Sequence, residues 1–257
     1  MEVHHHSHTE RKKWTHYLWE FLMLFIAVFC GFLAENQREH IVEHKRAKEY
    51  AKGLLLDLQN DTADVKVAAG YDSLTSLMID SLVTLVSDKS PSKKGGEYYY
   101  YTRMASSIYT IDWSRATLNQ LINSGNLRYF TNPELVTKIS LYNTTTATIS
   151  VLQQGILTHR DKAVAYRDQI LQAKYSSIFL EANMNSLYNG IRSPLIDSLR
   201  VTDIPLQNND PGLLNSYANA ILSTKGVRKN LVTKLYPKAI SEAVEIIELL
   251  RKEYQLK

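Results

Sequence analysis

The sequence predicts an all-α protein: one N-terminal transmembrane helix that continues into a stalk and an extracytoplasmic bundle of long helices. Three observations support this fold class. Residues 17–34 are almost wholly apolar. The 257-residue chain has only 10 Gly and 6 Pro, which favours long helices over a sheet with many turns. Over much of the remaining chain, apolar residues recur at spacings of three and four.

The apolar stretch from Tyr17 to Ala34, YLWEFLMLFIAVFCGFLA, carries one charged residue, Glu20. As a helix its eighteen residues would rise about 27 Å, close to the ~30 Å of a bilayer core. Because the stretch is long and no small-residue cleavage site follows it, we expect an uncleaved signal anchor. Basic and aromatic residues mark its membrane edge: Arg11, Lys12, Lys13, Trp14, Tyr17 and Trp19.

The anchor divides the chain into four predicted parts. Residues 1–16 form a His-rich basic tail, residues 17–34 the transmembrane helix, residues 35–53 a charged helical stalk, and residues 54–257 a helical domain. Basic residues follow the span as well as precede it, so a raw count of bases opposes a cytoplasmic N-terminus. The downstream bases, however, alternate with glutamates at helical pairing distance, whereas the upstream cluster is short and compact. We therefore predict an inner-membrane protein with a cytoplasmic N-terminus and a periplasmic domain.

Five residues of the span form one stripe of a helix and are predicted to contact lipid-embedded partner helices: Glu20, Leu24, Ala27, Gly31 and Ala34. The small residues Ala27 and Gly31, four apart, allow another helix to approach closely. Two hypotheses exist for Glu20. In the first its role is structural: it packs against a partner helix or reaches the headgroups. In the second it is a proton-responsive carboxylate in an accessory subunit of ion-coupled transport.

The N-terminal tail contains a cluster of histidines, His4, His5, His6 and His8. Neutral imidazoles grouped in this way bind divalent transition metals such as Zn, Cu or Ni. The alternative is a flexible basic tail at the anionic membrane face, whose histidines carry charge only at low pH. No other cofactor is predicted.

Residues 35–87 are expected to stay helical, with a loop at 88–96. The acidic residues Asp57, Asp61 and Asp64, with Asn60, lack the pattern of a calcium loop and are predicted to form a solvated face. The predicted apolar face consists of Leu54, Leu55, Leu58, Thr62, Val65, Ala69, Leu74, Leu77, Met78, Leu82 and Leu85.

A second helix is expected from Glu97, and the four adjacent tyrosines 98–101 are assigned to the core and its hydrogen-bonding rim rather than to a ligand platform. Asp112 or Ser114 would cap a short third helix, which ends before a left-handed residue at Gly125.

Asn132-Pro133-Glu134 predicts a strong helix start, and the helix would continue to about Lys174. Its length suits an antiparallel hairpin with the helix next to the stalk. Residues 176–214 are predicted to be irregular with short helices, and residues 215–254 to form a last helix with a kink near Pro237. The face of the 133–174 helix is heptad-like, as in a coiled coil: Leu135, Ile139, Tyr142, Thr146, Ile149, Gln153, Ile156, Ala163, Tyr166 and Ile170.

No motif of a known reaction is present: there is no GxGxxG, P-loop, HExxH, GxSxG or EF-hand pattern. The single cysteine, Cys30, lies in the span and excludes thiol-based zinc or redox sites within one chain. His159 is the only histidine after residue 44, so a His-based triad would have to use it. A net charge of +4 does not indicate a nucleic-acid partner. We therefore predict a protein that is not an enzyme.

The opening MEVHHHSHTERKKW and the following WEFLMLFIAVFCGFLAENQREH resemble the start of an uncharacterised group of single-span Bacteroidota membrane proteins. A related larger group of unknown function has a Gly-Glu entry to its first span and an Asn-Asn-Trp-Asn-Glu-like exit. Trp19-Glu20 and Ala34-Glu35-Asn36-Gln37 hold similar positions here, without the glycine or the exit tryptophan. The resemblance covers roughly the first 45 residues. It implies an inner-membrane protein with an extracytoplasmic helical domain, and no catalytic residues.

These observations favour a structural or interaction subunit, either a homo-oligomer or part of a larger membrane complex. The alternatives are the transport accessory that uses Glu20, the metal-binding tail, and a receptor-like sensor whose outer bundle binds a ligand.

Overall fold

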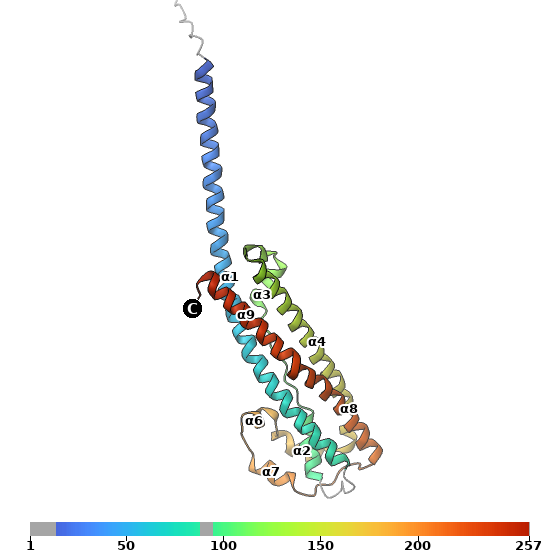
Figure 1. The fold of residues 1–257 in the computed structure, drawn as a ribbon. Coiled ribbons are helices and arrows are strands. Elements are labelled where there is room, and N and C mark those ends of the chain that lie inside the picture. Colours follow the sequence, from blue (N-terminus) through green and yellow to red (C-terminus); the bar gives the residue numbers. More distant parts are fainter. Residues whose placement is uncertain (1–13, 88–94, 257) are drawn as a thin grey trace, which may run out of the picture. The chain divides into compact units, whose positions relative to one another are not determined.

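The structure is a computed structural model that describes residues 14–87 and 95–256, and within these ranges the chain is all-α, without strands (Figure 1). The chain divides into two compact units, Met1–Tyr50 and Ala51–Lys257. The helices, in chain order, are α1 (Trp14–Ser87), α2 (Gly95–Ala105), α3 (Ala116–Asn123), η2 (Asn126–Tyr129), α4 (Pro133–Ile170), α5 (Ala173–Ser176), η3 (Ile178–Glu181), α6 (Met184–Tyr188), α7 (Pro194–Arg200), α8 (Pro211–Asn230), η4 (Leu231–Leu235) and α9 (Tyr236–Tyr254).

Local capping signals set several helix ends as predicted. Asn132 precedes α4, and its Oδ1 accepts hydrogen bonds from the backbone N–H groups of Glu134 and Leu135, at 2.9 and 3.3 Å. After α3, Gly125 has a φ of 65°, in the left-handed region that glycine tolerates best. The end of α4 lies at Ile170, before the predicted Lys174.

Other helix ends differ from the prediction. Neither Asp112 nor Ser114 caps α3: the N-cap residue is Arg115, and it makes no side-chain cap bond. Helix α8 begins at Pro211 rather than at residue 215, because Asp210 caps it by accepting the N–H of Leu213 at 2.8 Å. Helix α2 starts inside the expected loop, at Gly95, where a side chain would clash with the carbonyl oxygen of Ile204.

The core of the unit Ala51–Lys257 is formed largely by the predicted apolar faces. In α4, the predicted positions are buried except Tyr166, which is 37% exposed. Tyr98, Tyr99 and Tyr100 are buried, as expected of core residues. The prediction for Leu77 is wrong, since it is 57% exposed. Ile79 and Leu82 are fully buried, and Leu77 lies off their side of the helix.

Helices α1 and α4 run parallel, so the predicted antiparallel hairpin between them is wrong. Asp61 of α1 accepts a hydrogen bond from the hydroxyl of Tyr142 of α4, at 2.7 Å. Further along α1, Asp72 accepts from the hydroxyl of Tyr236, at 2.9 Å, and that hydroxyl accepts from Gln153 of α4, at 3.3 Å. Residue numbers therefore rise together along both helices. The antiparallel neighbour of both is the chain of α8, η4 and α9 (Figure 1).

Two parallel neighbours require a return segment between them, and residues 107–115, which have no regular secondary structure, provide much of it. Carboxylates of α1 accept hydrogen bonds from backbone N–H groups of this return segment. Asp64 accepts the N–H of Asp112 at 2.8 Å, and Asp61 accepts the N–H of Ser114 at 2.6 Å. Asp57 then accepts the N–H of Thr117, in the first turn of α3, at 3.0 Å.

The prediction of a solvated acidic face is therefore wrong for Asp61, which is 1% exposed. Asp57 and Asp64 are half-buried. The physical reason is that Asp61 accepts hydrogen bonds from the N–H of Ser114 and the hydroxyl of Tyr142, which replace water at its carboxylate.

A buried ion pair joins α1 to α8. A carboxylate oxygen of Asp72 contacts Nη1 of Arg228, and the two side chains are only 3% and 1% exposed. The second carboxylate oxygen accepts from Tyr236 of α9. Nη2 of Arg228 donates to the carbonyl oxygen of Ser107, at 2.9 Å. One polar network thus connects α1, α8, α9 and the return segment.

The last long helix is interrupted as predicted near Pro237. The interruption is η4, a π-helical turn of five residues at Leu231–Leu235, between α8 and α9. Proline has no N–H group, and its ring clashes with the carbonyl four residues earlier in a regular α-helix. The wider π turn accommodates both effects.

We expect Asp72→Ala to lower the free energy of unfolding by about 3–5 kcal/mol, because it leaves the buried guanidinium of Arg228 without its carboxylate. The matched control is Asp80→Ala, which removes a carboxylate that pairs with Lys225 between the same two helices, where the side chains are 52% and 32% exposed. The control should cost less than about 1 kcal/mol. Urea unfolding of the full chain, followed by circular dichroism, measures both. Equal losses would contradict the assigned importance of the buried pair.

Asp61 gives a pH-dependent prediction. Burial raises the pKa of its carboxyl in the folded state, although the hydrogen bonds from Tyr142 and Ser114 act in the opposite direction. A raised folded pKa favours folding below the unfolded pKa of about 3.9, and this contribution is lost as the pH rises through the folded value. Between pH 3.5 and 7, the stability of the wild type should therefore fall relative to that of Asp61→Asn, which cannot titrate.

The measurement is a series of urea unfolding curves across that pH range, with Asp203→Asn, at an exposed position, as the control. The stability difference between Asp203→Asn and the wild type should change less with pH. A difference between the wild type and Asp61→Asn that stays constant, or that moves in favour of the wild type as the pH rises, would rule out this role of Asp61.

Candidate functional site

The first candidate site is the apolar part of α1. In the range 14–42 every residue is exposed. By length and composition this helix can cross a membrane, and none of its apolar window is buried within the protein. The large side chains surround the helix, and Phe21, Phe25 and Phe29 stack along one side with ring centroids 6.3 and 6.0 Å apart. A soluble core helix would instead hide one apolar stripe.

The predicted packing stripe of this segment, Glu20, Leu24, Ala27, Gly31 and Ala34, is exposed throughout. A Cβ added at Gly31 would meet no atom within 4 Å, so the space beside it is open. The carboxylate of Glu20 lies 3.0 Å from Nε2 of His16, one helical turn earlier.

The predicted membrane-edge residues fall into two groups. Trp14, Tyr17 and Trp19 are 78%, 56% and 65% exposed at the start of α1. Arg11, Lys12 and Lys13 lie outside the described residues.

The histidine cluster His4, His5, His6 and His8 also lies outside the described residues, so the metal hypothesis stays a prediction. Within the ranges that the structure describes, no three His, Cys, Asp or Glu residues are grouped so that they could hold a metal ion.

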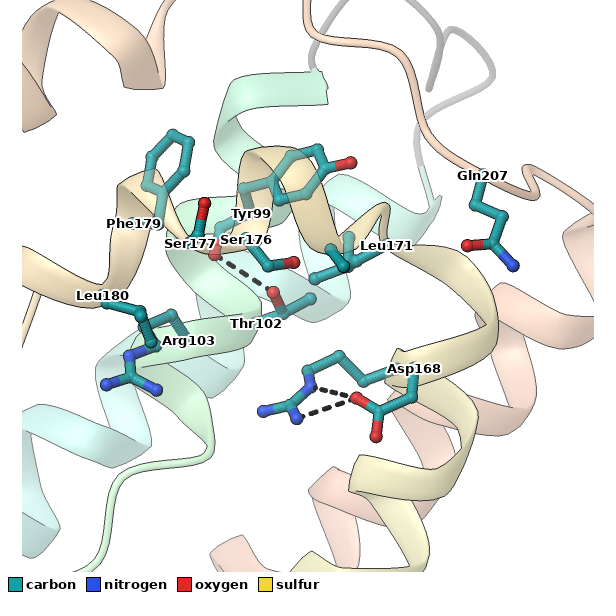
Figure 2. A pocket seen from close by; sticks show the side chains of 12 residues that line it. Tyr99, Thr102, Arg103, Asp168, Leu171, Ser176, Ser177, Phe179, Leu180 and Gln207 are labelled. Atoms are coloured by element: carbon teal, nitrogen blue, oxygen red, sulfur yellow. Dashed lines mark hydrogen bonds and ion pairs between the residues drawn. The ribbon is translucent and has the colours of Figure 1, made fainter.

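The second candidate site is a cavity of about 400 Å³ in the unit Ala51–Lys257, between α2, the end of α4, α5 and η3 (Figure 2). Its apolar wall includes Leu171, Phe179 and Leu180, and the residues Thr102, Ser176 and Ser177 also line it.

Tyr99 holds this wall in place. Its ring stacks on Phe179, with centroids 5.7 Å apart and planes inclined by 17°. Its hydroxyl donates to the carbonyl oxygen of Pro205, at 3.1 Å, and accepts the N–H of Gln172, at 2.9 Å. The hydroxyl of Tyr99 therefore connects α2 to the segments at Gln172 and Pro205, which flank the cavity. These bonds hold the cavity open without a ligand, as is usual for small-molecule sites.

Two cations line the same cavity, Arg103 of α2 and Arg167 of α4. The guanidinium of Arg167 donates to Asp168 at 2.8 and 3.0 Å, the ion pair drawn with dashed lines in Figure 2. Burial lowers the pKa of Arg103, and the like charges of Arg167 and Arg160 lower it further.

Sequence reasoning missed this cavity because its residues come from segments far apart in the chain. The only local signal was the pair Arg160 and Arg167, two helical turns apart on one face of α4.

Comparison with protein-family models, with curated proteins and with solved structures gave no match to this chain. The resemblance of its first residues to single-span Bacteroidota proteins therefore stays a prediction, and the functional conclusions rest on the chain's own residues.

Proposed function

We propose that the chain is a single-pass membrane protein that acts as a structural or interaction subunit, with residues 17–34 as the anchor. The observation that supports this proposal is the apolar surface of α1 in the range 14–42, where every residue around the helix is exposed. Its exposed large side chains include Phe21, Met23, Leu24, Phe25 and Val28, each at least 55% exposed.

Lipid is the environment that fits this surface. Moving a Leu, Ile or Phe side chain out of water contributes roughly 1.5–3 kcal/mol. The helix also satisfies its own backbone hydrogen bonds, which is a requirement for crossing a bilayer. Trp14, Tyr17 and Trp19 at its start are the residue types that favour a membrane interface. The compact basic cluster before them supports a cytoplasmic N-terminus and a domain on the periplasmic side of an inner membrane.

The interaction role follows from the small residues of the span. Ala27 and Gly31 lie on one stripe with Glu20, and the space beside Gly31 is open. In lipid, such stripes allow close packing of helix backbones, and a polar side chain on the same stripe gains a protein partner instead of lipid. A second copy of the chain or another membrane helix would provide that partner.

We expect the full chain to stay in the membrane pellet after an alkaline carbonate wash. The double variant Ile26→Arg/Phe29→Arg should move to the supernatant, because each arginine at the centre of a span costs roughly 2.5–3.5 kcal/mol on insertion scales. The matched control is Leu56→Arg/Leu77→Arg, which places two arginines at exposed leucines of the other unit and should stay in the pellet. Recovery of the wild type from the soluble fraction would overturn the proposed anchor.

Gly31→Leu should reduce crosslinked or native oligomers several-fold, because the new side chain fills the space that a partner helix would use. Within one chain a Cβ at this position meets no atom within 4 Å, so we expect the fold not to change. Leu33→Phe is the control, since it adds bulk about 200° around the helix from Gly31. Assembly that is unchanged in Gly31→Leu, measured by crosslinking and native mass spectrometry in membranes, would count against packing through this stripe.

A further inference from the structure

Three arginines of the unit Ala51–Lys257 line two cavities, one of which is the cavity of Figure 2. Arg103 and Arg167 line it, and the same two residues, with Arg160, also line a second cavity of about 400 Å³. Polar groups of Ser106, Asn183 and other residues line this second cavity. Three positive charges from two helices are thus concentrated beside two hollows.

Protein carboxylates balance only part of this charge. Arg160 contacts Asp161 at 3.3 Å, and Arg167 contacts Asp168 at 2.8 Å. Both aspartates are more than 60% exposed, at 69% and 62%, so water screens these pairs. Among the described residues, Arg103 has no carboxylate partner, and its Nε only reaches the carbonyl oxygen of Ala182, at 3.4 Å.

The charge of Arg103 is therefore half-buried, close to two like charges, and without a negative counterpart in the described part of the chain. Such an arrangement costs free energy, which a bound anion would offset. Guanidinium groups suit phosphate and carboxylate because their planar N–H donors bind two oxygens at once.

The cavity walls define the rest of the ligand. Leu171, Phe179 and Leu180 offer an apolar surface beside the arginines. The hydroxyl groups of Thr102 and Ser177 donate to backbone carbonyl oxygens, which leaves an anionic group to the arginines. A volume of about 400 Å³ falls in the range of small-molecule sites. A compact solute with one apolar part and one charged part fits both walls.

We propose that this cavity binds a small, water-soluble organic anion, a phosphate or carboxylate attached to an apolar body. Arg103 and Arg167 hold the anionic group, and the side chains of Leu171, Phe179 and Leu180 contact the apolar body. This site is independent of the membrane anchor, so it gives the proposed interaction subunit a ligand without depending on how the span assembles.

The test is calorimetric titration of phenyl phosphate into the full chain in phosphatidylcholine nanodiscs. The wild type should bind it, and Arg103→Gln should weaken binding by about tenfold or more, because charged hydrogen bonds to the ligand are lost. The matched control is Arg251→Gln, which removes one exposed positive charge from α9, away from the cavity lining, and should bind like the wild type. Inorganic phosphate and benzyl alcohol, which each carry half of the ligand's chemistry, should bind more weakly than phenyl phosphate.

Three results would overturn the proposal: no binding by the wild type at millimolar phenyl phosphate, equal binding by Arg103→Gln, or an equal loss in Arg251→Gln. Inorganic phosphate that binds as tightly as phenyl phosphate would overturn the role of the apolar wall. Circular dichroism checks that each variant is folded. If Arg103→Gln does not fold, Arg167→Gln serves as the second variant, with the same expected loss and the same contradicting outcome.

Discussion

The backbone N–H groups of the segment that returns from α2 to α3 need acceptors, and the arrangement of the larger unit depends on how this need is met. The carboxylates of Asp61 and Asp64 accept the N–H groups of Ser114 and Asp112. The acceptors lie on successive turns of α1, so the segment is held along that helix against the direction of the chain in α1. This return brings the chain back to the end of the unit at which its part of α1 begins. Helix α4 therefore starts at that end and runs parallel to α1.

The buried pair of Asp72 and Arg228 then fixes the third long element. Replacing a buried ion pair by apolar residues often costs a protein little, so such a pair is better regarded as a positional constraint than as a source of stability. Here both carboxylate oxygens are used, one by Arg228 and one by Tyr236. Helices that pack only through apolar side chains could shift by one turn against each other. The contacts of Asp72 with Arg228 and Tyr236 instead form in a single alignment of α8 and α9 against α1. The hydrogen bond from Gln153 to Tyr236 extends the same constraint to α4.

The sequence was informative wherever a structural feature is decided by neighbours in the chain. The cap at Asn132, the left-handed residue Gly125 and the break near Pro237 depend on local backbone chemistry, and most apolar faces follow from helical periodicity alone. The direction of α4 does not follow from periodicity, because the apolar face of a long helix can pack in either direction. The connecting segment decides between the two.

The same limit explains the errors at polar positions. The spacing of Asp57, Asp61 and Asp64 indicates one helix face but not what covers it, and a solvated face is the default for acids. The long apolar helix at residues 17–34 needed only composition to be predicted. The arginine-lined cavity needed contacts between α2, α4 and the short helices after it, and no periodic pattern in the chain encodes such contacts.

The π turn at Leu231–Leu235 has a geometric consequence for the residues on either side of it. Arg228 and Tyr236 are eight positions apart, which in an uninterrupted α-helix places them about 80° apart around the axis. A π turn absorbs one extra residue, which reduces the offset to about 20° and lets both side chains reach the two oxygens of Asp72. The π turn therefore corrects the angle between Arg228 and Tyr236 around the helix axis. A homologous chain one residue shorter here could replace it with plain α-helix and keep both contacts, whereas one with a further insertion would turn them apart.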